Sequence, residues 1–411
     1  MFNIERGART LIAFSLLSSF GVSAVFPYIP IFGKEIGMPV FLIGNLVLLY
    51  YLLQAVTRIP LGKISDIVGH HAPIMIGSLL YFISAGSFVA SIYFWPTLFL
   101  GEIALGVANS VIWVTVPSYI TESEGALPLY SFSIGLGWLL GSPVGGYIKD
   151  TFGMSAVFLT LLSVSVVLIY LSWEFYYGTN QEGRRESVRG FIRMARLSPT
   201  SLPVYPSLKS YVEGWRLLNT NRHLLFAGLF SFIVFMTFGL GSSIVPLYFS
   251  EVGITSFLIG ILVSIRLATS TSIRLTSKFF TRRFGDYRVL VTSTIVAGTF
   301  IILVSRTQAF PLIAIFSALW GLGSGMYLPI VFDIIGKHST EEERGIAMGI
   351  RGTLGTLGAA FGTWTFSSLA ASLSLDDALF FAGVFTVASS IVLGLVFRGE
   401  AGGKKAKQEE K

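Results

Sequence analysis

Long apolar stretches, separated by short polar segments, run along almost the whole chain. Each stretch is long enough to cross the roughly 30 Å hydrocarbon layer of a bilayer as a helix. The pattern predicts an all-α membrane protein with twelve transmembrane helices. The predicted spans are approximately residues 10–32, 40–60, 72–93, 96–119, 127–147, 154–174, 223–249, 256–276, 289–308, 311–333, 345–371 and 378–397.

The first part of the chain is repeated in the second. Residues 30–69 align without a gap with residues 246–285, 216 positions later, and 11 of the 40 positions are identical. Two similar halves that rock against each other around a shared site are typical of secondary transporters. We therefore expect two pseudo-symmetric six-helix bundles with a cytoplasmic loop between them and a cytoplasmic tail. The expected boundaries are 1–174 for the first bundle, 175–222 for the central loop, 223–398 for the second bundle and 399–411 for the tail.

Basic residues lie almost entirely on one side of the predicted membrane. With the N-terminus in the cytoplasm, 24 of the 29 Lys and Arg residues are cytoplasmic, and only Lys34, Lys149 and Arg306 are on the outer side. This distribution follows the positive-inside rule. We therefore expect a multi-pass protein of the cell (inner or plasma) membrane with both termini in the cytoplasm. The net charge of +7 reflects topology, so nucleic acid is not an expected partner.

Composition argues against several other classes of protein. The chain is 53% hydrophobic and has no cysteine, which excludes disulfides and thiolate metal sites. Its four histidines fall at predicted cytoplasmic ends, and no His, Asp or Glu cluster has catalytic or metal-ligand spacing. A Walker loop is also absent from the sequence. We expect neither an enzyme nor an ATP-driven pump, and no metal or other cofactor.

The turn between the second and third spans carries a recognisable motif. It reads Gly62-Lys63-Ile64-Ser65-Asp66-Ile67-Val68-Gly69-His70-His71 and resembles the cytoplasmic loop signature of the major facilitator superfamily. The resemblance implies twelve spans, of which spans 1, 4, 7 and 10 line a substrate cavity. It also implies that Asp66 braces the two halves near Arg344, with Arg351 in the same network. Ile67 departs from the pattern, and the second copy has Arg282 in place of the aspartate.

A second motif lies in the fifth span, from Gly137 to Gly146. It resembles the G-x-x-x-G-P-x-x-G-G signature of proton-coupled efflux antiporters of the same superfamily, although Ser142 occupies the proline position and Pro143 follows it. The resemblance implies a drug:proton antiporter, whereas ordinary packing of small residues is the alternative. The residues that carry it are Gly137, Gly141, Pro143, Gly145 and Gly146.

Three charged side chains lie well inside predicted spans, namely Glu102, Arg266 and Arg351. Such residues normally face protein or water because a charge in lipid is costly. Glu102 heads a stripe with Gly106, Asn109 and Trp113 on one helix face. This makes Glu102 a candidate proton carrier, with Asp333 as the next candidate. The alternative is a structural Glu102 that reaches water.

Candidate substrate contacts lie in both halves. Asn109 and Trp113 extend the stripe of Glu102, and span 10 presents Trp320 and Tyr327 on one face. Aromatic faces suit flat apolar or cationic ligands, although such stripes also serve plain packing. Arg266 could neutralise a carboxylate, hold an anionic substrate, or form a structural pair.

Together these features predict a monomeric secondary transporter in the lipid bilayer. We expect it to export a small, largely apolar solute in exchange for protons by alternating access. One alternative is an uptake symporter for an organic anion or a sugar, with Arg266 binding the substrate. A membrane receptor or scaffold that binds without transport is an alternative of another class.

Overall fold

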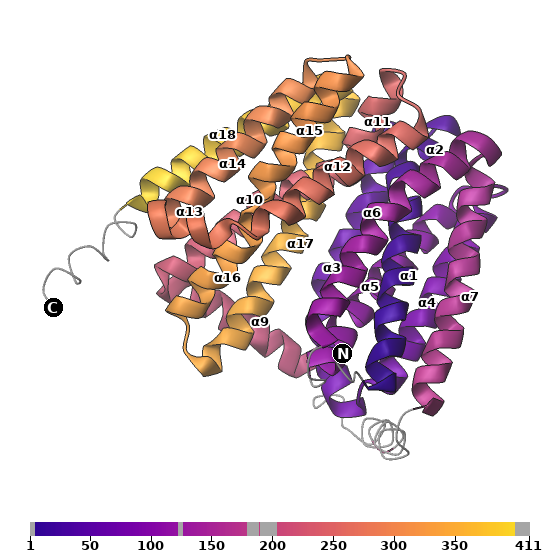
Figure 1. Cartoon of the computed structure of the whole chain (residues 1–411), viewed down its shortest axis with the longest axis horizontal. Coiled ribbons are helices and arrows are strands. Elements are labelled where there is room, and N and C mark those ends of the chain that lie inside the picture. Colours follow the sequence, from indigo (N-terminus) through magenta and orange to yellow (C-terminus); the bar gives the residue numbers. More distant parts are fainter. Residues whose placement is uncertain (1–4, 122–125, 179–188, 190–203, 399–411) are drawn as a thin grey trace, which may run out of the picture. The chain divides into compact units, whose positions relative to one another are not determined.

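The computed structural model describes residues 5–121, 126–178, 189 and 204–398. All the regular elements of these residues are helices (Figure 1). The elements of the first half are α1 (Arg6–Val25), η1 (Phe26–Tyr28), α2 (Ile29–Glu35), α3 (Val40–Val68), α4 (His71–Ala90), α5 (Thr97–Thr121), α6 (Ala126–Phe152) and α7 (Met154–Gly178).

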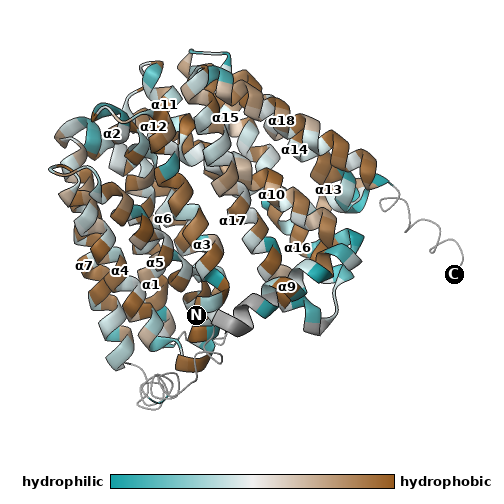
Figure 2. Cartoon of the chain, turned by 180° about the vertical axis from the view of Figure 1, so that it is seen from behind, coloured by the Kyte–Doolittle hydropathy of each residue, from teal (hydrophilic) through white to brown (hydrophobic). Residues whose placement is uncertain are grey.

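A surface helix, α9 (Val204–Thr220), precedes the second half. The elements that follow are α10 (Arg222–Ser242), α11 (Ile244–Glu251), α12 (Ser256–Arg274), α13 (Ser277–Phe284), α14 (Asp286–Ser305), α15 (Phe310–Gly325), α16 (Tyr327–His338), α17 (Glu341–Ser372) and α18 (Leu375–Val396). In Figure 2 the long helices are largely hydrophobic, and hydrophilic residues concentrate near helix ends and around α9.

Within the described residues, ten helical segments are long and apolar enough to cross a membrane. The remaining two predicted spans correspond to α6 and α17, which are 27 and 32 residues long. Both are rich in glycine, and α17 begins with a run of charged residues, which lowers its average apolarity. The all-helical membrane fold that the sequence predicts is therefore confirmed.

Three of the predicted spans are interrupted. The first consists of α1, η1 and α2, the seventh of α10 and α11, and the tenth of α15 and α16. In each case a proline lies within the first three residues after an interruption: Pro27 and Pro30, Pro246, and Pro329. A proline is tolerated there because the first turn of a helix has no internal partner for its N–H groups.

The chain forms two compact units. The first contains residues 1–38, 45–210 and 255–260, and the second contains residues 39–44, 211–254 and 261–411. Most of each unit comes from one half of the sequence. However, the first turns of α3 and α12 belong to the unit of the other half.

The sequence repeat is confirmed in the helix bounds. Helix α3 begins at Val40 and α12 at Ser256, 216 positions later. Glycines in the left-handed region of backbone conformation recur with the same offset: Gly37 and Gly253 precede the two helices, and Gly69 and Gly285 follow them. Only glycine adopts this conformation without strain. The copies differ in that α3 continues to Val68, whereas α12 ends at Arg274 and is followed by α13.

Candidate functional site

Glycines of α6 form a track along α1. A Cβ atom at Gly137, Gly141 or Gly145 would lie 2.5, 2.4 or 1.9 Å from the carbonyl oxygen of Leu16, Phe20 or Ala24. Only glycine allows the two backbones to come so close. The second unit has the same arrangement, because Gly358 and Gly362 of α17 meet the carbonyls of Phe232 and Met236 on α10.

The other residues of this motif face the first turn of α12. A Cβ at Gly146 would lie 2.2 Å from the Ser256 carbonyl oxygen, and one at Gly260 would lie 2.7 Å from Cα of Pro143. The hydroxyl of Tyr28 lies 2.5 Å from the carbonyl oxygen of Ser142 and 3.1 Å from that of Ser256. The motif in the fifth span therefore packs against two helices, α1 and α12.

Helix α5 carries Glu102, the acidic side chain that the sequence predicts to lie deep in a span. Glu102 is fully buried, and among the described residues neither of its carboxyl oxygens has a hydrogen-bond partner. One turn further along, a Cβ at Gly106 would lie 2.8 Å from the carbonyl oxygen of Tyr50. This face of α5 therefore packs directly against the backbone of α3.

Asn109 continues the same face and joins three helices. Its amide nitrogen donates to the hydroxyl of Tyr50 at 2.7 Å, and its side-chain oxygen accepts a hydrogen bond from the hydroxyl of Tyr81. Asn109 is buried, whereas Trp113, one turn further, is 39% exposed. The stripe on α5 predicts Asn109 but neither tyrosine, because these partners lie 59 and 28 positions away in the chain.

Arg266 of α12 occupies a narrow site in the second unit. Its guanidinium carbon lies 4.4 Å from the centroid of the Trp320 ring, a cation–π arrangement. A Cβ at Gly241 of α10 would lie 2.5 Å from the guanidinium, and one at Gly321 of α15 would lie 2.3 Å from the Arg266 carbonyl oxygen. Glycines on two helices therefore make the room that this arginine fills.

A second arginine of the same unit takes part in a series of hydrogen bonds. Arg351 donates to the hydroxyl of Tyr327 at 3.0 Å, and Tyr327 donates to the hydroxyl of Ser231 at 2.6 Å. The guanidinium of Arg351 also lies 4.9 Å from the centroid of the Phe332 ring. Two predicted site residues, Arg351 and Tyr327, are thus in direct contact.

The remaining predicted residues lie in the last third of α3, in α16 and at the beginning of α17. Asp66 and Arg344 are exposed, near the end of α3 and the beginning of α17. Gly62 contacts α5, since a Cβ there would lie 3.1 Å from Val114. Asp333 is also exposed and forms an ion pair with Lys337.

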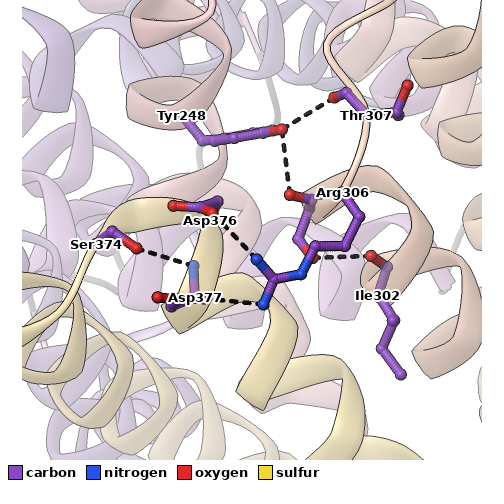
Figure 3. A network of polar contacts seen from close by, with 8 residues as sticks. Tyr248, Ile302, Arg306, Thr307, Ser374, Asp376 and Asp377 are labelled. Carbon is purple, nitrogen blue, oxygen red and sulfur yellow. Dashed lines mark hydrogen bonds and ion pairs between the residues drawn. The ribbon is translucent and has the colours of Figure 1, made fainter.

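In the second unit, a polar network connects α11 with the end of α14 and the first turn of α18 (Figure 3). Arg306 donates to Asp376 at 3.2 Å and to Asp377 at 2.8 Å, and Tyr248 donates to the Thr307 carbonyl at 2.9 Å. A depression of about 790 Å³ adjoins this network and is lined in part by Glu251. Arg306, a predicted outer-side base, is therefore neutralised by two carboxylates.

The sequence profile of the Major Facilitator Superfamily matches residues 11–265 and 229–411. The chain therefore belongs to this superfamily, which confirms the resemblance of its loop motif.

Related proteins and structures agree with this assignment. An MFS-type transporter of Methanocaldococcus jannaschii is 21% identical over 414 residues, which cover 96% of this chain and 98% of the relative. The multi-drug resistance efflux pump PmrA of Streptococcus pneumoniae is 24% identical over 394 residues, or 93% of each chain. The crystal structure of the nucleoside transporter NupG superposes with a TM-score of 0.73 at 14% identity, covering 96% of this chain and 99% of NupG.

These findings define the class of protein. The chain is a multi-pass membrane transporter of the major facilitator type, and it is a transport protein rather than an enzyme. Its ligands are small molecules, and it is embedded in the lipid bilayer.

Proposed function

We propose that the transporter exports a small, largely apolar solute in exchange for protons. The relative PmrA is described as a multi-drug resistance efflux pump, and the motif in the fifth span resembles that of proton-coupled efflux antiporters. The transporter would work as a monomer in the cell membrane, with both termini in the cytoplasm. Its two units would move to expose the solute to either side in turn.

The observation that carries the proposal is the environment of Glu102. An ionised carboxylate without a partner in an apolar interior is strongly unfavourable, whereas a protonated carboxyl carries no charge. Binding or loss of a proton at Glu102 would therefore change the preferred environment of this face of α5. Asn109 and its two tyrosines, on the same face, supply hydroxyl and amide groups that could rearrange with it.

Other predicted residues take supporting roles in this proposal. Asp66 and Arg344 would brace the units in one state of the cycle. Asn109, Trp113, Arg266, Trp320 and Tyr327 would contribute to solute binding, directly or by shaping the site. Asp333 would carry the proton if Glu102 does not.

A second candidate is uptake of an organic anion together with protons. The position of Arg266 in the middle of α12, against Trp320, favours it, because a guanidinium on an aromatic ring can bind a carboxylate or a phosphate. The direction of coupled flux separates the two candidates.

The test is a flux assay in proteoliposomes with an imposed pH gradient. The solute panel should include permanently charged lipophilic cations, organic anions, nucleosides and sugars. Permanent charge matters because weak bases accumulate in acidic vesicles without a carrier, so protein-free liposomes are the control. An antiporter moves solute toward the acidic side, and a symporter moves it toward the alkaline side. Flux that ignores the gradient would exclude proton coupling, and binding without flux would indicate a receptor.

A further inference from the structure

The N-terminus of α12 is capped by a carboxylate from another helix. Asp150, near the end of α6, accepts the backbone N–H of Ser256 at 3.0 Å through one oxygen and that of Phe257 at 2.8 Å through the other. The first N–H groups of a helix have no partner within the helix. A carboxylate satisfies them and also interacts favourably with the positive end of the helix dipole.

Close packing accompanies this cap. Gly146 and Gly260 leave no room for a side chain between α6 and the first turn of α12. The Tyr28 hydroxyl lies within hydrogen-bond distance of carbonyl oxygens on both helices, those of Ser142 and Ser256. Residues 255–260 therefore belong to the first unit, whereas α12 from Ile261 onward belongs to the second.

Among the residues that the structure describes, no side chain caps the equivalent turn of α3 in this way. Gly44, the counterpart of Gly260, packs closely on Ser367 of α17. The track glycines Gly137 and Gly358 meet equivalent carbonyls, which relates α6 to α17 by an offset of 221 positions. By this offset the counterpart of Asp150 is Ala371, and by the 216-residue repeat the counterpart of Tyr28 is Ile244.

We propose that Asp150 is a positioning residue of the transport cycle: its carboxylate holds the first turn of α12 on α6 in one conformation and releases it in the other. The inference rests on the alternating-access part of the proposed function. A helix shared by two units must either stay attached to both or detach from one when the units move. The cap supplies a directional contact that is either made or broken, and it biases the attached state.

The experiment measures attachment directly. The chain has no cysteine, so Tyr147→Cys and Phe257→Cys can be spin-labelled without background. The side chains of Tyr147 and Phe257 are 57% and 39% exposed, and their rings lie 6.3 Å apart. Pulsed electron paramagnetic resonance on the purified protein in lipid nanodiscs, with no solute and no pH gradient, then reports the fraction of molecules with a short distance.

Asp150→Asn should lower the ratio of short to long distances. The amide keeps one acceptor and loses the charge, so a roughly 2- to 5-fold decrease is expected from the range for a charge at a helix N-terminus. Glu35→Gln is the matched control: this carboxylate lies in the same unit and forms an ion pair with Lys149 at 2.6 Å. It should leave the distance distribution unchanged.

Two results would overturn the inference: an unchanged ratio in Asp150→Asn, or an equal change in Glu35→Gln. If Asp150→Asn does not fold, Asp150→Glu is the second variant. Its side chain keeps the charge but is one methylene longer, so it should also lower the ratio of short to long distances. An unchanged ratio would then reject the inference. The measurement involves neither solute nor protons. A failure of proton-driven flux would therefore reject the proposed function and leave this result standing.

Discussion

The contact of α3 with α5 and the contact of α12 with α15 are two versions of one arrangement. Tyr50 and Arg266 are equivalent in the repeat, and the carbonyl of each meets a glycine, Gly106 in one unit and Gly321 in the other. Both contacts bring two helices together at backbone distance. The duplicated chain has therefore kept the shape of this contact.

The charges at the two contacts differ. Four residues before the glycine, the first unit has Glu102 and the second has Ser317; both are buried. Conversely, the second unit has Arg266 where the first has Tyr50. One unit thus carries an acid and the other a base on the same scaffold. In the proposed mechanism, proton binding belongs to the first unit, and Arg266 shapes the solute site in the second.

The largest effect is expected from removing the acid. Glu102→Gln should abolish flux driven by a pH gradient and retain solute exchange at equal concentrations, because the neutral amide mimics the protonated carboxyl. Ser317→Ala, at the equivalent position, should leave both activities nearly intact. Proteoliposome flux measured with and without the pH gradient reports gradient-driven transport and solute exchange separately. Normal gradient-driven flux in Glu102→Gln would show that Glu102 does not carry the proton, and Asp333 would be the next candidate.

The close helix contact that recurs in the two units can be disrupted in either unit by adding a side chain at its glycine. Gly106→Ala and Gly321→Ala each place a Cβ less than 3 Å from a backbone carbonyl, and such overpacking costs roughly 1–3 kcal/mol. Both variants should unfold at lower temperature in detergent. Gly86→Ala is the control, since nothing lies within 4 Å of its added Cβ. Equal unfolding temperatures for all three variants would show that the contacts are loose.

Replacing Arg266 should slow solute exchange but leave the coupling of solute flux to protons intact. Arg266→Gln removes the cation–π interaction with Trp320, which is worth about 0.5–2 kcal/mol. Solute exchange should slow by roughly 2- to 30-fold, while the ratio of fluxes with and without a pH gradient is unchanged. Tyr50→Phe provides the comparison at the equivalent site. A loss of gradient dependence in Arg266→Gln would contradict the division between the units.

The smallest effect is expected at the loop motif. Asp66→Asn should slow transport by roughly 2- to 5-fold, the range for a charge near a helix end, without weakening solute binding. Arg282→Gln, at the equivalent position of the second copy, should have less effect. Exchange rates and equilibrium binding measured on the same preparations distinguish the two predictions. Equal rates for Asp66→Asn and the unmodified protein would leave Asp66 with a role in topology alone.

Much of the fold could be predicted from local sequence signals. Apolar length locates the helices, and the repeat places the equivalent beginnings of α3 and α12 at Val40 and Ser256. The interruption at Ser243 was not predicted, because the apolar pattern continues through it and only the local backbone changes.

The polar site was harder to predict than the fold. Glu102 is recognisable as an acid within an apolar run, but the tyrosines that bind Asn109 come from other helices. Asp150 resembles a solvated residue at a helix end in the sequence. Its role as a cap depends on a helix that begins 106 positions later. Such contacts arise from helix packing, which a single sequence does not report.

The most direct test of the central claim is proton release on solute binding. Purified transporter in weakly buffered detergent solution, with a pH indicator, is mixed with a saturating concentration of a solute that the flux assay identifies. If solute and proton compete through Glu102, the unmodified protein should release about one proton per molecule, as binding linkage requires, and Glu102→Gln should release none. Equal proton release from both proteins would show that Glu102 does not carry the exchanged proton.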